Sequence, residues 1–160
     1  MIRFIRHHSA SIAALILAII AIGSIASAYM KTEIEREERE ILRTSGRAPA
    51  AVLNVTEFDW GEISRTQIAQ QDFLISNRGN ADLTISTIAT SCGCTTAQLR
   101  LDGNAAELPA ILPPNRQGVI HIEFDPDAHD ARGDTERAVR IETNDPDQPF
   151  LVINLHAYVR

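Results

Sequence analysis

The chain of 160 residues contains only two cysteines, and it has no run or stripe of basic side chains. Acidic residues outnumber lysine and arginine, which leaves a formal net charge of −6. A protein this acidic is a poor candidate for binding nucleic acid or an anionic lipid surface. The sequence also lacks a nucleophile elbow, a zincin motif, a phosphate-binding glycine loop and a dinucleotide fingerprint. We therefore expect no enzymatic activity, no cofactor, no nucleic-acid partner and no small-molecule substrate.

One long apolar run lies near the N-terminus. Arg3 and Arg6 precede an uncharged stretch, Ile12–Met30, which is rich in alanine, isoleucine and leucine. As a helix this stretch would span roughly 28 Å, close to the roughly 30 Å hydrocarbon core of a bilayer. Positive residues favour the cytoplasmic side, so the C-terminal part would lie outside the cytoplasm. We interpret residues 1–30 as a single transmembrane anchor that contacts the lipid bilayer through residues 12–30.

A cleaved signal peptide is the alternative interpretation of the same segment. Its apolar core would be Ile12–Ile22, and the small residues Ala26-Ser27-Ala28 would form a cleavage signal. The anchor is favoured because the apolar run continues through Tyr29 and Met30, and tyrosine is common at membrane interfaces. In either case the rest of the chain is exported.

Residues 31–50 are predicted to form a charged helical stalk and a linker. Glu35 and Arg39 stand four residues apart with opposite charges, a spacing that stabilises a solvated helix by a few tenths of a kcal/mol. Thr44-Ser45-Gly46 should end the helix, and Arg47-Ala-Pro49 is typical of a short linker.

From residue 51 to residue 160 the apolar residues alternate with polar ones, as they do in strands that are buried on one face. The segment Ile120–Phe124 shows this alternation and ends at Asp125-Pro126, and Val139–Glu142 shows it before Asn144-Asp-Pro146. Gly, Pro, Asn and Asp separate about seven such segments. The pattern predicts an all-β domain, an immunoglobulin-like antiparallel β-sandwich of about seven strands. Two cysteines one residue apart exclude the Cys-Trp-Cys core of antibody domains, whose disulfide bridges two sheets.

A series of short motifs follows the same order along this domain: Phe58-Asp-Trp-Gly61, Phe73-Leu-Ile-Ser-Asn77-Arg-Gly79, Ser91-Cys-Gly-Cys-Thr95, Leu112-Pro-Pro114, Ile122-Glu-Phe-Asp125 and Thr143-Asn-Asp-Pro146. Together they resemble the bacterial domain-of-unknown-function family 1573, an exported immunoglobulin-like module related to domains of hydin and abnormal-spindle proteins. The resemblance covers roughly residues 52–159. It implies a fold and an exported location, and no established chemistry. Asn115 replaces a glycine that usually follows the Leu-Pro-Pro turn, and asparagine can also adopt a left-handed conformation.

The pair Cys92 and Cys94 is the main candidate site. The main interpretation is a disulfide that closes a very small ring, for which Gly93 supplies the backbone freedom. The alternatives are thiol redox chemistry and a Cu(I) site, since two thiolates on one loop suit that soft ion. A thioredoxin-like Cys-x-x-Cys motif and its βαβ setting are absent from the sequence.

Other metal sites are not favoured by the pattern. His121, His129 and His156 have no ligand-like spacing, and we expect surface histidines. The aspartates of residues 127–134 lack the regular spacing and central glycine of an EF-hand loop, so we expect a solvated acidic loop rather than a calcium site.

These observations lead to one functional hypothesis and one alternative. The hypothesis is a membrane-anchored immunoglobulin-like binding or scaffold module of the bacterial inner membrane, with its N-terminus cytoplasmic and its C-terminal domain periplasmic. Its partners would be subunits of a membrane protein complex, whether respiratory, photosynthetic or envelope-related. The alternative is a periplasmic thiol-redox or Cu(I)-handling protein that acts through Cys92 and Cys94.

Overall fold

The structure, a computed structural model, describes the backbone of residues 2–160 and the side chains of residues 15–160. It contains two compact units, Met1–Ile41 and Leu42–Arg160, and each is described by itself.

The first unit is helical. Helix α1 (Ile2–Thr44) is continuous, so the predicted anchor and the predicted charged stalk form one long helix rather than an anchor followed by a short stalk. The reason is local, because no glycine or proline interrupts the chain between residues 24 and 44 and the stalk adds its own ion pairs, Lys31–Glu35 and Glu35–Arg39. The helix ends where the sequence predicts, and Gly46 lies just beyond it with a φ of +68°.

The apolar part of α1 is exposed to its surroundings. The helical segment Leu15–Thr44 is long enough to cross a membrane and contains an 18-residue window with a mean hydropathy of 1.7, and a signal sequence would have the same character. The side chains of the predicted span before Leu15 lie outside the described residues.

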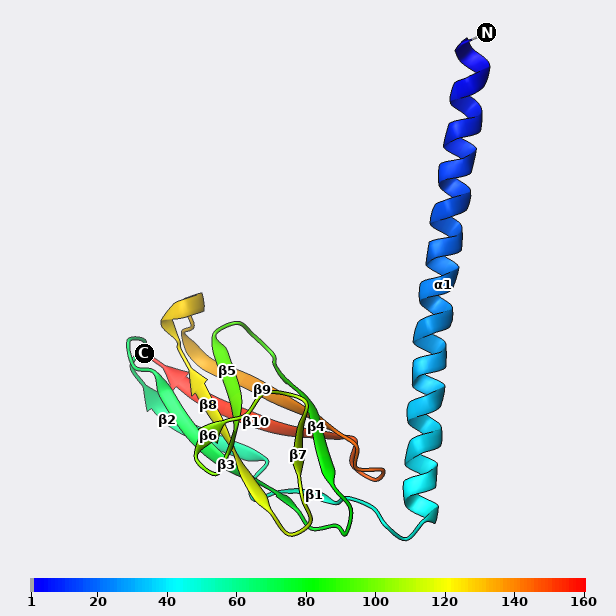
Figure 1. Ribbon diagram of the computed structural model, residues 1–160. Coiled ribbons are helices and arrows are strands. Elements are labelled where there is room, and N and C mark those ends of the chain that lie inside the picture. The colour runs from blue at the N-terminus through cyan, green and yellow to red at the C-terminus, as the bar shows by residue number, and fades with distance from the viewer. Residues whose placement is uncertain (1) are drawn as a thin grey trace. The chain divides into compact units, whose positions relative to one another are not determined.

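The second unit is a sandwich of ten strands in two five-stranded sheets (Figure 1). Sheet A has the order β1 (Ala51–Leu53), β3 (Ala69–Asn77), β8 (Gln117–Phe124), β5 (Thr95–Leu101), β6 (Asn104–Ala105). Sheet B has the order β2 (Glu57–Ile63), β10 (Phe150–Val159), β9 (Gly133–Thr143), β4 (Leu83–Thr90), β7 (Ala110–Leu112). A short 3₁₀ turn, η1 (Asp127–His129), joins β8 to β9.

The predicted strand number was therefore too low, and one pair of strands is not antiparallel. The missed strands are β2, β6 and β7; the last two have only two and three residues, too few to show alternation. In β2, Gly61 has a φ of +68° and interrupts the apolar alternation after Trp60. This strand pairs with β10 in parallel, with a register shift between His156 and Tyr158.

The core lies between the two sheets and confirms the predicted inward-facing residues. Each of these side chains is at most 2 % exposed: Ile120, Ile122, Phe124, Val139, Ile141, Ile153 and Leu155. A second, smaller apolar cluster contains Ile63, Ala69, Cys94, Phe124, Ala131, Ala157 and Val159. This second cluster includes Cys94, so the candidate site lies at this end of the core.

Candidate functional site at the Cys-Gly-Cys turn

The Cys-Gly-Cys turn carries the chain from β4 in sheet B to β5 in sheet A. Cys92 and Cys94 form a disulfide with their Cα atoms 5.4 Å apart. Gly93 stands between them, and a Cβ on this residue would lie 3.3 Å from Nε2 of His129. The absence of a side chain at position 93 thus leaves room for the imidazole of His129 beside the turn.

Backbone hydrogen bonds attach the turn to both sheets. The N–H of Ser91 donates to the carbonyl of Ala138 in β9 (2.9 Å), and the Ser91 hydroxyl accepts from the N–H of Ala138 (3.0 Å). On the other side, the N–H of Asp125 donates to the carbonyl of Cys94 (2.9 Å). The disulfide is therefore held between the end of β8 and the middle of β9.

The two sulfur atoms have different surroundings. Cys94 is 2 % exposed and belongs to the second apolar cluster, whereas Cys92 is half-buried. Nε of Arg137 donates to Sγ of Cys94 at 3.1 Å, and its guanidinium carbon lies 5.3 Å from the centre of the Phe124 ring. Sγ of Cys92 accepts instead from the neutral backbone N–H of Cys94 at 3.0 Å.

Arg137 was not predicted from the sequence to be a functional residue. A signal was present, because Arg137 occupies an inward-facing position of β9 between buried Thr135 and buried Val139. A charged residue at an inward position requires a partner. The partner itself could not be read from spacing, since Cys94 is 43 residues away along the chain.

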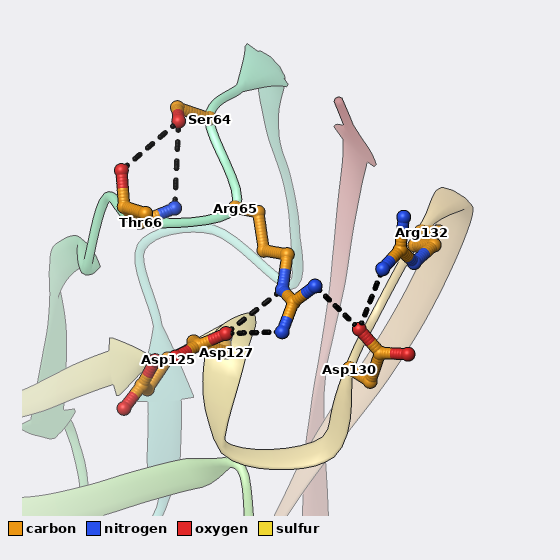
Figure 2. Close-up of polar contacts among 7 residues, drawn as sticks. All are labelled: Ser64, Arg65, Thr66, Asp125, Asp127, Asp130 and Arg132. Atoms are coloured by element: carbon orange, nitrogen blue, oxygen red, sulfur yellow. Dashed lines mark hydrogen bonds and ion pairs between the residues drawn. The ribbon is translucent and has the colours of Figure 1, made fainter.

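A network of ion pairs holds the η1 segment beside the turn (Figure 2). Arg65, in the loop between β2 and β3, donates to Oδ1 of Asp127 (2.8 Å from Nε) and contacts Oδ1 of Asp130 (2.7 Å). Arg132 also pairs with Asp130 at 3.0 Å. The hydrogen bond from Arg132, together with the charges of Arg132 and Arg65, lowers the pKa of Asp130 below its ordinary value. Two of the aspartates in the acidic loop are thus neutralised by arginine.

His121 and His156 have separate acidic partners, on different sheets. His121 lies 2.6 Å from Asp72 and 3.3 Å from Glu123, on sheet A. His156 lies 3.0 Å from Asp59 and 3.4 Å from Asp134, on sheet B. Within residues 15–160, no group of three or more His, Cys, Asp or Glu side chains is placed to hold a metal ion.

The carboxylates of Asp59 and Asp134 raise the pKa of His156. The hydrogen bond with Asp59, with a smaller contribution from Asp134, raises the pKa of His156 above its ordinary value. The backbone N–H of Gly61 and then His156 lower the pKa of Asp59. This pair links the edge strand β2 to β10.

The strands on either side of the turn leave part of each sheet edge uncovered. β7 pairs only with Leu83–Ile85 of β4, and β6 pairs only with Arg100 and Leu101 of β5. Within the part of the chain that the structure describes, no strand pairs with the outer side of residues 86–90 or 95–98. These two stretches contain no charged residue and no proline.

The opposite edge of sheet B differs in character. Strand β2 is also an edge strand, but it carries Glu57, Asp59 and Glu62 and is interrupted at Gly61. Charges and irregular backbone protect an edge strand against pairing with another chain. The uncovered edges of β4 and β5 lack such charges, although the pairing of β4 with β9 has a register shift between Ile85 and Thr87.

Comparison with solved structures shows the same fold in other proteins. A protein of unknown function from Porphyromonas gingivalis W83 is 20 % identical with a TM-score of 0.59; the match covers 71 % of this chain and 48 % of that one. The chain thus spans about half the length of that protein. The ASH/PapD-like domain 7 of human CEP192 is 12 % identical with a TM-score of 0.50, covering 71 % of this chain and 87 % of that one.

The VesB protease of Vibrio cholerae also contains the fold, at 10 % identity and a TM-score of 0.52, with 74 % of this chain and 33 % of that one covered. At these identities the likeness shows the immunoglobulin-like, PapD-like fold alone. No curated protein matches the sequence. A family model does match over residues 51–159, which is most of the chain and confirms the resemblance noted from the motifs. The chain therefore belongs to the family described as protein of unknown function DUF1573.

Proposed function

We propose that this chain is a single-pass protein of the bacterial inner membrane whose immunoglobulin-like domain lies outside the cytoplasm. The domain serves as a binding or scaffold module, an accessory subunit of a larger membrane protein complex, and it is not an enzyme. The apolar segment of α1 supports the anchor, and Arg3 and Arg6 before it support a cytoplasmic N-terminus.

The uncovered edges of β4 and β5 carry the binding proposal. An edge without charge or proline is a ready template for an added strand, because its free backbone groups can pair with an extended segment. The occupant we propose is an extended segment of a partner subunit that pairs with one of these edges. The acidic edge of β2 makes the opposite side of the domain a poorer template.

Topology can be tested first, with the full chain in cells whose outer membrane has been removed. Protease should digest residues 51–160 and spare the anchor. A mature N-terminus at Tyr29 would overturn the anchor and leave a secreted domain, without affecting the binding proposal.

The edge can be tested by site-specific crosslinking. A photo-crosslinking residue at Thr87 in β4 or Gln98 in β5 should trap a membrane protein that also co-purifies in mild detergent, and the same residue at Glu62 in β2 should not. Gln98→Lys should reduce co-purification, while Glu62→Lys serves as the matched control. Crosslinking at Glu62 alone, or a chain that purifies without any partner, would contradict the proposal.

A further inference from the structure

The two cysteines of the disulfide differ in exposure. Cys94 is 2 % exposed and packs within the cluster formed by Phe124, Ala131 and Ala157. Cys92 is only half-buried. A thiolate opens a disulfide by direct contact with the sulfur that it attacks, so access selects the sulfur. Cys92 packs only partly against the same cluster, so an incoming thiolate reaches it more readily than Cys94.

The charged group of the site lies at the other sulfur. Arg137 places its Nε 3.1 Å from Sγ of Cys94, and its guanidinium keeps a positive charge at all ordinary pH values. Stacking on Phe124 fixes the direction of this side chain. A charged donor binds an anionic sulfur more strongly than the neutral N–H that Cys92 accepts. A thiolate beside arginine has a lowered pKa, and a thiol of lower pKa leaves faster.

We propose that Cys92–Cys94 is a thiol–disulfide exchange site with a fixed direction, in which Cys92 is attacked and Cys94 is the leaving thiolate. The sulfur of an incoming thiolate forms a bond to Sγ of Cys92, and the Cys92–Cys94 bond breaks. The bonding electron pair goes to Sγ of Cys94, which remains as a thiolate beside Arg137. The incoming thiol is oxidised to a mixed disulfide and Cys94 is reduced, so no further reactant is needed. Attack by Cys94 on the mixed disulfide reverses the step.

The segment beside the turn supports this asymmetry. Ala131 contributes to the cluster that buries Cys94, and Arg65 holds the preceding residues through Asp127 and Asp130 (Figure 2). His129 is the titratable group nearest Gly93 on this side, and Arg137 is the charged group that contacts sulfur from β9. The two sulfurs are therefore distinguished by packing and by charge together.

The direction of opening can be measured with reduced glutathione as the probe. The full-length chain in detergent is incubated with glutathione, quenched with acid and alkylated, and the adducts are located by peptide mass spectrometry. We expect glutathione on Cys92 and the alkyl group on Cys94, in about tenfold excess over the reverse arrangement. Equal labelling of the two cysteines, or glutathione mainly on Cys94, would overturn the proposal.

The role of Arg137 is tested on the reduced protein. In the Cys92→Ser variant, the ultraviolet absorbance of the remaining thiolate against pH gives the pKa of Cys94. Arg137→Gln should raise this pKa by about one pH unit or more, and in the two-cysteine chain should slow opening by glutathione about tenfold. Arg137→Lys should keep part of both effects. Arg140→Gln, on the same strand but beside Phe150 and Glu142, should change neither.

An unchanged Cys94 pKa in Arg137→Gln would overturn the assignment of Arg137. If Arg137→Gln fails to fold, Arg137→Lys and the labelling of the natural chain still decide the question.

The source of the thiol is distinguished in cells with Cys94→Ser, which leaves Cys92 free to hold a mixed disulfide. A small thiol adds only its own mass, whereas a protein thiol produces a larger species that reducing agent removes. A free Cys92 in cells, together with no opening by glutathione, would overturn the exchange site.

Discussion

Asp145 accepts a hydrogen bond of 2.7 Å from the backbone N–H of Ala51, the first residue of β1. The same carboxylate accepts from the N–H groups of Asp147 (2.8 Å) and Gln148 (3.2 Å), and its residue is 3 % exposed. A buried carboxylate that accepts three backbone hydrogens has its charge well compensated. Asp145 thus attaches the beginning of the domain to the turn that precedes β10.

Replacing Asp145 by asparagine should destabilise the domain. An amide of the same shape presents a donor where the carboxylate accepted a hydrogen bond, and at least one buried N–H loses its partner. We expect a loss of about 1–3 kcal/mol. The measurement is urea unfolding of the full chain in detergent, followed by the fluorescence of Trp60, the single tryptophan. Asp102→Asn, which affects only an exposed ion pair with Arg116, should cost less than about 1 kcal/mol. Equal losses in the two variants would contradict this role of Asp145.

Gly79 is predicted to tolerate no side chain. A Cβ on this residue would lie 2.2 Å from the carbonyl oxygen of Ala48 and 2.5 Å from the nitrogen of Ala50, both backbone atoms. Gly79→Ala should therefore displace the linker before β1 and cost at least about 2 kcal/mol in the same unfolding experiment. Gly103→Ala is the control: its Cβ would meet nothing within 4 Å, so only the positive φ of +82° opposes it, at about 1–2 kcal/mol. If Gly79→Ala lost less stability than Gly103→Ala, the linker would move aside at little cost and the prediction would be wrong.

The strands with regular alternation could be predicted from the sequence, because burial on one face requires it. Ile120, Ile122 and Phe124 illustrate this, since all three face the core. Asn115, predicted to accept a left-handed turn, has a φ of +62°.

Contacts between distant segments could not be predicted in the same way. The approach of Arg65 to Asp127 joins residues 62 positions apart, and neither has a spacing that identifies the other. The bond from Arg137 to Cys94 depends on which strand lies next to the turn, so it follows from the topology. The sequence therefore predicted the disulfide candidate, and only the structure distinguishes its two sulfurs.

Truncating Ile122 should show how much the core between the sheets contributes to the free energy of unfolding. This side chain is fully buried, and Ile122→Ala removes apolar contacts and leaves a cavity, at a cost of about 2–5 kcal/mol. Ile111→Ala in the edge strand β7 removes the same atoms from a residue that is 58 % exposed, and should cost less than about 1 kcal/mol. Urea unfolding measures both. Similar costs at the two positions would contradict the assignment of Ile122 to the core.

The pair of His156 and Asp59 should make stability depend on pH in two directions. Because folding raises the pKa of His156, its contribution is complete below the ordinary histidine pKa and is lost as pH rises through the folded value. Because folding lowers the pKa of Asp59, its contribution is present above the ordinary aspartate pKa and is lost as pH falls through the folded value. The pair should therefore stabilise the link between β2 and β10 most between about pH 4 and pH 6.5.

The measurement is the unfolding midpoint of the full chain between pH 5 and pH 8, at low salt because both groups lie at the surface. The midpoint of the natural chain should fall as His156 loses its proton. His156→Gln should flatten this fall, and Asp59→Asn should reduce it, since Asp59 makes the largest contribution to the raised histidine pKa and Asp134 a smaller one. A fall of the same size in His156→Gln would assign the pH dependence to another group.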